Sequence, residues 1–397
     1  MFTEKSWDWI KRILFIFIIW RLGLFVVAFF SSSFIPNFGA RFPYYDTVLT
    51  VTNLPGWVWG FGNFDGVHYL KIASLGYVDN FQQAFFPVYP IIIHIVAKVI
   101  FLLPGNITQN PERIYFLGAL FVSNIAFIGL LGVYYKLIRL DFNTSNATKS
   151  IILLILFPTA FYFSSVYTES IFFLLVVSSL YFIRKKEFII AGILALFASA
   201  TRITGVLLVI PIYMEWRNQL KQIENTAYCG FLKGIIGITL APVGLLLYML
   251  FLYLKFYNPL YFLTSQPAFG AQRSALPFVL LPQVIVRYIK MLLSVPVFSL
   301  SYLNIVLELL ATFIPLVLLF LIYKNIKKSY LWFILSALIL PTLTGTLSSM
   351  PRYSLVIFLI FPYLVNKYPN RVTLIYIASG VLQAVLLTLF IRGYWVA

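Results

Sequence analysis

Long apolar runs separated by short polar clusters dominate the chain. Four runs, at residues 13–30, 234–254, 305–323 and 372–391, come close to the roughly 20 residues that cross a hydrocarbon core. Because a bilayer offers no water to bond with, each spanning backbone must be helical. Together with several shorter apolar runs, the pattern predicts an all-α polytopic membrane protein of about ten to twelve transmembrane helices.

The composition supports this class of protein. Hydrophobic residues make up 61% of the chain and charged residues only 10%, whereas a soluble domain carries about 25% charged residues. The net charge of +17 indicates basic cytoplasmic loops, such as residues 184–187 and 324–328. Nucleic-acid binding would require a basic domain apart from the apolar runs, and the sequence has none. The single Cys229 excludes an internal disulfide and a cysteine metal cluster.

No low-complexity tract or internal repeat divides the sequence, so residues 1–397 are expected to form one membrane domain. The first apolar run follows basic residues and has no small-residue cleavage site, which indicates an uncleaved anchor with its N-terminus inside. Residues 36–83 form the one long loop, rich in the glycine and aromatic residues of membrane interfaces. We expect this loop to be extracytoplasmic and to carry short interfacial helices.

Part of this loop, FGNFDGVHYLKIASLGYVDNFQQAFFPVYP at residues 61–90, gathers polar groups in an otherwise apolar chain. Its pattern predicts a short helix over residues 65–75, with Asp65 capping the first turn and Gly76 ending the last. A capped helix lying in the interface would account for Asp65. It would not account for the histidine and lysine that follow, so the stretch is also a candidate functional site.

Three further ionisable residues interrupt apolar runs, where a charge is costly and is a functional candidate by default. Glu169 lies between two short runs, Arg202 within a third, and Arg352 at the start of a fourth. Glu169 and Arg202 could simply pair with each other, and Arg352 could extend to the interface or hold a phosphate bidentately. His94 also lies in an apolar run, where a lone histidine is more often a satisfied core residue.

These features indicate a polar site near one membrane face, built from carboxylates, a histidine and arginines. Such a site suits an enzyme acting on a lipid-linked anionic substrate, and equally a transporter or lipid flippase. A transporter predicts repeated halves and helices broken near the midplane, and no internal repeat is evident. The sequence has no His-x-x-x-His pair, cysteine cluster or glycine-rich phosphate loop, and hence no metal motif.

The chain carries DGVHYLKIASLGY and, closely after it, AFFPVYP. Further along come FPTAFYFSSVYTESIFFLL, ALFASATRITGVLL, SSMPRYSLVIFLIFP and the final GYWVA. Together and in this order, the motifs resemble those of the PIG-V family of membrane mannosyltransferases. They run from about residue 60 to the end, and the absence of long loop insertions makes the chain resemble prokaryotic relatives.

The resemblance implies a GT-C fold and an inverting sugar transfer at the extracytoplasmic face. The acceptor hydroxyl would attack the anomeric carbon of a mannosyl or other hexosyl group on polyprenyl or dolichyl phosphate, and the lipid phosphate would leave. Asp65 would be the general base, because an ordinary carboxylate with a pKa of about 4 is ionised at neutral pH. The implied substrate-binding residues are His68, Lys71, Tyr77, Phe86, Tyr89, Tyr167, Glu169, Arg202, Arg352 and Tyr353.

Within this set, His68 would position a substrate one helical turn after Asp65, and Arg202 and Arg352 would stabilise the leaving phosphate. Many GT-C proteins have two neighbouring acidic residues in this loop, whereas here Asp65 follows Phe64. That argues against a metal held by an Asp-x-Asp pair, so we expect a metal-independent reaction without a cofactor.

The implied partners are the lipid-linked donor, a lipid-linked or glycan acceptor, membrane lipids and a small membrane protein. A non-catalytic subunit of a glycosylation complex is a third alternative to the enzyme and the transporter. The expected location is the plasma membrane in a prokaryote or the endoplasmic reticulum membrane in a eukaryote.

Overall fold

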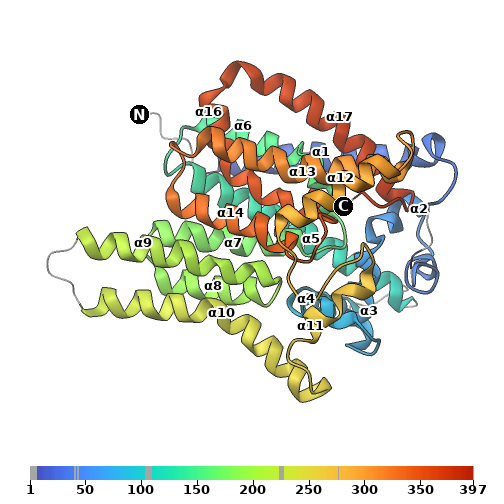
Figure 1. The fold of residues 1–397 in the computed structure, drawn as a ribbon, viewed down its shortest axis with the longest axis horizontal. Helices are drawn as coiled ribbons and strands as arrows, with labels where there is room; N and C mark the ends of the chain where they lie inside the picture. Colours follow the sequence, from blue (N-terminus) through green and yellow to red (C-terminus); the bar gives the residue numbers. More distant parts are fainter. Residues whose placement is uncertain are drawn as a thin grey trace. The chain divides into compact units, whose positions relative to one another are not determined.

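The computed structural model describes residues 7–39, 42, 44–102, 110–222, 228–275 and 277–396. Helices make up the regular structure of these residues (Figure 1), and their one extended pairing is an isolated parallel bridge between Val279 and Thr344. The predicted all-α class is therefore confirmed. The chain divides into two compact units, and the predicted single domain stays a prediction.

Unit 1 comprises Met1–Gly76, Val88–Val177 and Val365–Tyr394. Its long and short helices are α1 (Asp8–Phe34), η1 (Tyr45–Leu49), η2 (Thr50–Thr52), α2 (Gly56–Trp59), η3 (Gly60–Gly62), α3 (Asp65–Leu75), α4 (Val88–Phe101), α5 (Pro111–Ile138), α6 (Thr144–Ile155), η6 (Ala160–Ser164), the first half of α7 (Glu169–Arg184), the end of α16 (Phe361–Lys367), η10 (Pro369–Arg371) and α17 (Val372–Ile391). The segment predicted as the long loop thus carries short helices, as expected.

Unit 2 comprises Tyr77–Pro87, Ser178–Leu364 and Trp395–Ala397. Besides the other parts of α7 and α16, its helices are η4 (Gln82–Ala84), α8 (Phe188–Ser199), η7 (Ile203–Leu208), α9 (Val209–Gln222), α10 (Tyr228–Phe256), α11 (Tyr261–Thr264), η8 (Gln266–Phe269), α12 (Leu281–Ser294), α13 (Leu300–Ile322), α14 (Lys328–Thr342), α15 (Met350–Tyr353) and η9 (Ser354–Ile360).

Five helices of the described chain are long and apolar enough to cross a membrane, namely α1, α5, α10, α13 and α17. Four of them match the four runs expected from the sequence, although α13 ends one residue before its run does, so these runs are confirmed as helices long and apolar enough to span. Helices α4, α8 and α14 are shorter and apolar, and the total of ten to twelve transmembrane helices stays a prediction.

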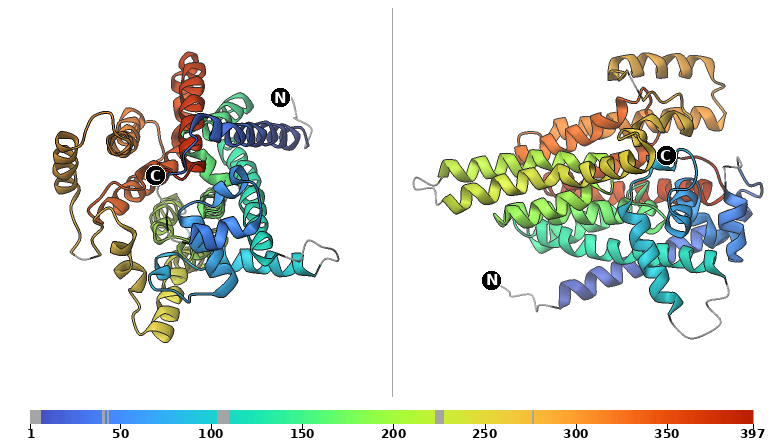
Figure 2. Two further views of the ribbon diagram at one scale, coloured as in Figure 1. Left: turned by 90° about the vertical axis from the view of Figure 1, so that its right-hand side faces the viewer. Right: turned by 90° about the horizontal axis from the view of Figure 1, so that it is seen from below.

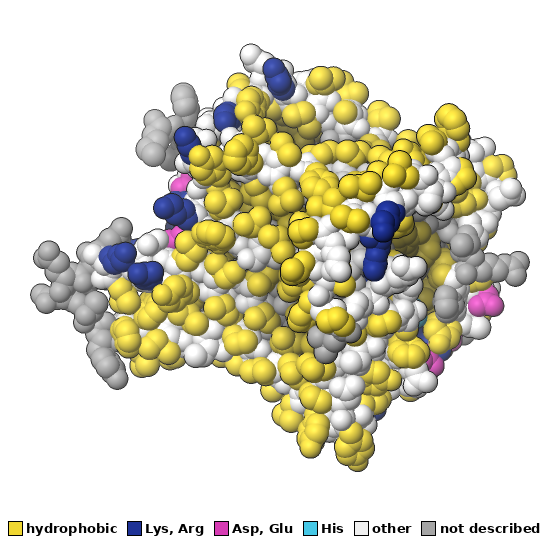
Figure 3. Space-filling model, in the orientation of Figure 1, with side chains coloured by type: hydrophobic (Ala, Val, Ile, Leu, Met, Phe, Trp, Pro, Cys, Tyr) yellow, Lys and Arg dark blue, Asp and Glu magenta, His cyan; other side chains and the backbone are white. Residues whose placement is uncertain are grey.

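Hydrophobic side chains cover much of the face shown in Figure 3, and the long helices expose large hydrophobic side chains such as Phe15, Leu247 and Phe320. Surfaces of this kind suit contact with lipid.

Helix α5 is central to unit 1. Of its most apolar stretch 56% is buried, compared with 28% for those of α1 and of the helix at Pro369–Ile391, and α5 packs against α1, α3, α4 and α6. A buried amide joins α17 to two other helices of the unit, α1 and α6, and to the turn that follows α6. Gln383 on α17 accepts a hydrogen bond from the Trp20 indole (3.1 Å) and donates to the carbonyls of Ile155 and Phe157 (2.8 and 2.7 Å).

Between α6 and α7, where Glu169 was expected to lie between two short apolar runs, the chain leaves the α-helix. Residues 159–168 are nevertheless all buried. Irregular backbone is tolerated among apolar helices where protein covers it and side chains satisfy its polar groups. Here the Ser165 hydroxyl donates to the Phe161 carbonyl (2.9 Å), and the Ser170 hydroxyl donates to that of Phe163.

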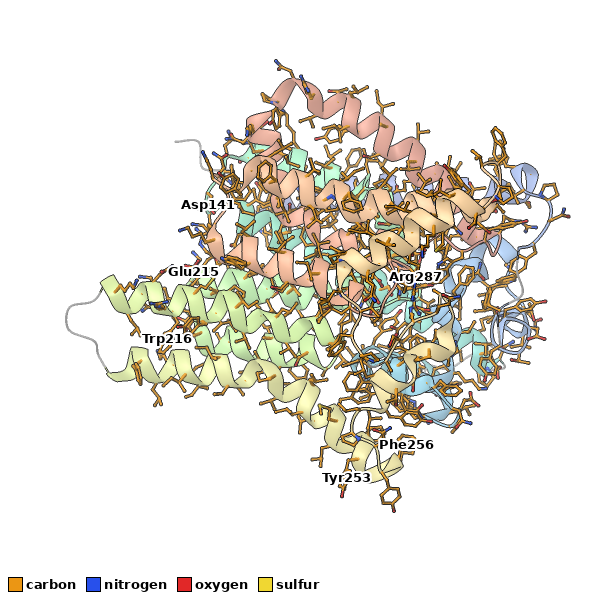
Figure 4. The ribbon with its side chains drawn as sticks, in the orientation of Figure 1. Asp141, Glu215, Trp216, Tyr253, Phe256 and Arg287 are labelled. Atoms are coloured by element: carbon orange, nitrogen blue, oxygen red, sulfur yellow. The ribbon has the colours of Figure 1, made fainter. Side chains whose placement is uncertain are left out.

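In unit 2, helices α8, α9 and α10 lie side by side (Figures 1 and 2). Glu215 on α9, labelled in Figure 4, accepts a hydrogen bond of 2.6 Å from Ser329 at the start of α14. Helices α8 and α10 approach so closely that a Cβ added to Gly192 would lie 2.7 Å from the Gly237 Cα. A Cβ on Gly244 would lie 1.9 Å from the Leu196 carbonyl oxygen.

We expect Gly244→Ala to destabilise unit 2, because its methyl group overlaps the α8 backbone and overpacking typically costs about 1–3 kcal/mol. Gly230 lies in the first turn of the same helix and has nothing within 4 Å of an added Cβ. Gly230→Ala is therefore the control, and it should be neutral or stabilising, since alanine favours a helix interior over glycine by about 0.5–1 kcal/mol. Thermal unfolding of both purified variants in detergent measures the difference, and equal midpoints would contradict the close α8–α10 contact.

Candidate functional site

The predicted helix over residues 65–75 is present as α3, and Gly76 ends it with a φ of 78° that favours glycine. Phe64, and not Asp65, occupies the N-cap position, so the predicted N-cap placement of Asp65 is wrong. The Phe64 side chain makes no capping hydrogen bond, and Asp65 is the first helical residue. At that position a carboxylate still interacts favourably with the positive end of the helix dipole.

Phe64 has the backbone angles φ 60° and ψ −114°, which are rare for a bulky residue. Such a conformation costs about 1–3 kcal/mol and persists where the surroundings impose it, often at functional sites. Here its ring lies 4.7 Å from that of Phe42 and 6.0 Å from that of Phe390, measured between centroids. The residue immediately before Asp65 is therefore held in an unfavourable backbone conformation by aromatic packing.

Asn63 fixes the same turn to α17. Its buried Nδ2 donates to the carbonyls of Phe390 (2.7 Å) and Ile391 (3.2 Å), at the C-terminal end of that helix. These carbonyls are among the last of α17, which have no partner within the helix. The Asn63 carbonyl in turn accepts a hydrogen bond of 2.8 Å from the Tyr167 hydroxyl.

The buried stretch before α7 packs against the start of α3. The Val166 amide donates to the Phe61 carbonyl (2.9 Å), and a Cβ on Gly66 would lie 3.3 Å from the Val166 carbonyl oxygen. Tyr167 follows directly and Glu169, 0% exposed, begins α7. The structure thus brings the motifs around Asp65 and Glu169 together, although they are about a hundred residues apart in sequence.

His68 and Lys71 lie on one face of α3, three residues apart. Both contact Tyr44: the His68 and Tyr44 rings meet edge to face at 5.8 Å, and the Lys71 ammonium lies 3.8 Å from the centre of the Tyr44 ring. A cation at this distance from a ring is attracted to its face. Tyr44 therefore orders the polar face of the helix that Asp65 begins.

Tyr89 on α4 is fully buried in unit 1. Its hydroxyl bonds to the Ser123 hydroxyl at 2.7 Å and donates to the Ala119 carbonyl at 3.3 Å, and Glu169 is within electrostatic range. His94, on the same helix, bonds through Nδ1 to the Ala73 carbonyl of α3 (2.8 Å), as expected of a structural histidine. Both residues join α4 to its neighbours.

Tyr77 and Phe86 lie in unit 2, in an aromatic cluster around α10. The Tyr77 hydroxyl donates to the Phe85 carbonyl (2.6 Å), and the Phe86 ring lies 4.8 Å from that of Tyr248 and 5.5 Å from that of Phe262. These contacts pack the 77–87 segment against α10. The substrate-binding roles of both residues stay predictions.

The structure brings Arg202, Arg352 and Tyr353 together in unit 2. The guanidinium carbons of Arg202 and Arg352 lie 5.8 and 5.7 Å from the centre of the Tyr353 ring, and Arg352 is only 5% exposed. Arginine matches phosphate geometry, and the substrate-binding roles of these three residues stay predictions.

Sequence reasoning missed several buried polar residues. Asn63 gave no signal, because its partners lie more than 300 residues away. Arg21 and Glu308 did give a sequence signal, because each is a charged residue within a membrane-spanning run. Arg21 lies over the rings of Phe25 and Phe61, 4.2 and 4.5 Å from their centres, and Glu308 belongs to a polar network described below.

We expect Asn63→Asp to destabilise unit 1 strongly. The aspartate is isosteric but cannot donate, so the Phe390 and Ile391 carbonyls lose the hydrogen bonds from Asn63 and face a buried carboxylate, at about 1–3 kcal/mol or more for each lost bond. The Phe390 carbonyl keeps its bond from the Gly393 amide (3.0 Å). Asn53→Asp is the control, because Asn53 is exposed and its left-handed conformation suits both residues. Thermal unfolding in detergent gives the comparison, and equal stability of the two variants would contradict this role for Asn63.

These features define a helical integral membrane protein with a strained, carboxylate-bearing helix start in one unit and a cluster of arginines in the other. The chain belongs to the mannosyltransferase (PIG-V) family, whose profile matches residues 11–266. The resemblance drawn from the motifs is therefore confirmed. The matched range includes Asp65, Glu169 and Arg202 and ends before Arg352.

Two curated relatives illustrate the likeness. GPI mannosyltransferase 2 of Cryptococcus neoformans var. neoformans serotype D is 32% identical over 145 residues, which are 36% of this chain and 34% of that protein. GPI mannosyltransferase 2 of Drosophila pseudoobscura pseudoobscura is 30% identical over 138 residues, or 34% and 29% of the two chains. The chain thus matches about a third of the length of these relatives.

Proposed function

We propose that the chain is a membrane mannosyltransferase. It moves a mannosyl residue from a polyprenyl- or dolichyl-phosphate-linked donor to a lipid-linked or glycan acceptor. Family membership supports the class of reaction. The observation that carries the proposal is the start of α3, where Asn63, Tyr167 and the strained Phe64 hold Asp65 within the part of the chain that the family profile matches.

In the proposed reaction Asp65 accepts the proton of the acceptor hydroxyl as its oxygen attacks the anomeric carbon. The bond between that carbon and the phosphate oxygen breaks, and the lipid phosphate leaves with the electron pair, so the anomeric configuration inverts. General-base catalysis of this kind is typically worth about 10²- to 10⁴-fold. His68 and Lys71, on the same face of α3, are proposed to contact the substrates.

Arg202 and Arg352 are proposed to bind the phosphate of the donor and to stabilise its charge as it leaves. Fixed positive groups act most strongly where charge develops in an environment that excludes water. Among the described residues no group of three or more potential metal ligands gathers, and the metal-independent reaction stays a prediction. The protein's location in a plasma or endoplasmic reticulum membrane, and a small membrane protein as its partner, are likewise predictions.

Sugar transfer by the purified protein in liposomes tests the proposal. Polyprenyl-phosphate mannose, labelled in the sugar, is offered with a panel of lipid-linked and free glycan acceptors, and both the glycosylated product and the released lipid phosphate are measured. Formation of both in equal amounts supports the proposal. Movement of labelled donor across the bilayer without a product would instead support the transporter or flippase alternative.

A further inference from the structure

A polar network lies inside unit 2, around the hydroxyl of Tyr288 on α12. This hydroxyl donates to the Glu308 carboxylate on α13, accepts a hydrogen bond of 2.9 Å from the Leu347 amide, and bonds to the Thr346 hydroxyl at 3.1 Å. Because the single Tyr288 proton goes to Glu308, Thr346 is the donor in the last of these bonds. All four residues are less than 9% exposed.

The Tyr288 hydroxyl is protonated, as its role as a hydrogen-bond donor requires. Burial raises the pKa of the Tyr288 hydroxyl, and the neighbouring Glu308 raises it further. Tyr288 therefore keeps its proton at any physiological pH and remains a donor to the carboxylate. The Thr346 hydroxyl oxygen also accepts a hydrogen bond of 3.1 Å from the Ser348 amide. The two successive backbone amides of Leu347 and Ser348 therefore both bond to hydroxyl groups of this network.

The network belongs to a longer set of contacts that fixes residues 343–349, which we call the 343–349 loop. This loop joins α14 to α15, the short helix that carries Arg352. Every residue of the loop bonds to the segment 273–288, through Val279 to Leu343 (3.0 Å), Ser274 to Thr344 (2.8 Å), Arg287 to Gly345 (2.7 Å), Tyr288 to Thr346 and Leu347, and Arg273 to Ser348 (3.5 Å) and Ser349 (3.2 Å).

Two residues of the loop have left-handed backbones, Gly345 with a φ of 84° and Ser349 with a φ of 70°. The serine conformation is uncommon without support from its surroundings. Ser349 is fully buried, directly precedes α15 and accepts a hydrogen bond from Arg273. Arg273 also acts electrostatically on Glu308. The 343–349 loop is therefore connected by hydrogen bonds to Arg273, Arg287 and Tyr288, and Tyr288 is bonded in turn to Glu308.

We propose that Tyr288 and Glu308 are positioning residues for the donor phosphate: by holding the 343–349 loop, they fix Arg352, on the helix that follows the loop, where the phosphate binds. The inference rests on the proposed function. Tyr288 meets the loop at its middle, where the buried Leu347 amide has the tyrosine hydroxyl as its acceptor. Removal of that hydroxyl leaves the amide and the Thr346 hydroxyl without their acceptor, and the loop must rearrange to satisfy them.

The test uses the full-length protein and a probe without sugar, a short-chain polyprenyl phosphate, whose binding is measured directly. Tyr288→Phe should raise the Kd of the probe and the KM of the mannosyl donor by about tenfold or more, while kcat changes much less. Glu308→Ala removes the acceptor of the Tyr288 hydroxyl and should weaken probe binding as well, whereas Glu308→Gln retains an acceptor and should restore it. Tyr302→Phe, a half-buried tyrosine on α13, is the matched control.

Equal Kd values for Tyr288→Phe and wild type would overturn the inference, as would a fall in kcat with unchanged Kd and KM. If Tyr288→Phe does not fold, Thr346→Val replaces it: valine should weaken probe binding and Thr346→Ser should restore it, and equal binding by both would again overturn the inference. A wild type that binds the probe but transfers no mannose contradicts the proposed function alone. A wild type that does not bind the probe contradicts both.

Discussion

Asp65→Asn is expected to reduce sugar transfer by about 10²- to 10⁴-fold, the usual contribution of a general base. The amide has the shape of the carboxylate and cannot take the proton of the acceptor hydroxyl. Phe64, and not Asp65, is the N-cap residue, so the substitution leaves the N-cap residue unchanged. It weakens the favourable interaction of the side chain with the helix dipole, which is worth about 0.3–1 kcal/mol.

The comparison must separate catalysis from folding. Asp46→Asn is the matched control, since Asp46 is an exposed carboxylate earlier in the same segment. It should transfer sugar at the wild-type rate. Initial rates are measured at saturating donor and acceptor, together with the thermal unfolding midpoint of each variant in detergent. Transfer by a folded Asp65→Asn protein at the rate of Asp46→Asn would exclude Asp65 as the base.

The parts of the structure that follow from local sequence were predictable. The four long apolar runs became helices, because a backbone in lipid must bond internally. Helix α3 begins and ends where its pattern indicates, since Gly76 provides a left-handed stop. Each of these features depends on residues that are close together in the chain.

Features that depend on distant residues were not predictable. The N-cap placement of Asp65 failed because Phe64, whose φ is positive and whose ring packs against Phe42 and Phe390, occupies the N-cap one residue earlier. Likewise, the role of Asn63 depends on the end of α17, more than 300 residues away. Such pairings cannot be read from periodicity or propensity, because both describe neighbours in sequence.

Buried ionisable groups were only partly predictable. Composition marks every charge in an apolar run as a candidate, which led to Glu169, Arg202 and Arg352. The same rule applied to Glu308, and only the structure connects it to Tyr288 and the 343–349 loop. The sequence therefore indicates which residues are costly to bury, whereas the fold determines which other groups each of them meets.

Arg352→Gln is expected to have the second large effect, a loss of about 10²- to 10³-fold in kcat/KM for the donor. Arg352 is 5% exposed and shares the Tyr353 ring with Arg202, so it provides charge in a site that largely excludes water. Arg352→Lys keeps the charge and loses the planar fork that binds phosphate bidentately. Its activity should therefore lie between those of wild type and Arg352→Gln.

Arg217→Gln is the control for this series, because Arg217 is an exposed arginine of the same unit, on α9. Donor kcat and KM are measured for all variants, with Arg202→Gln and the double substitution Arg202→Gln/Arg352→Gln. If both guanidinium groups bind one phosphate, their effects are coupled and the double variant should depart from the sum of the single ones. Strict additivity would mean that the two arginines act separately, and wild-type kinetics for Arg352→Gln would remove Arg352 from the phosphate site.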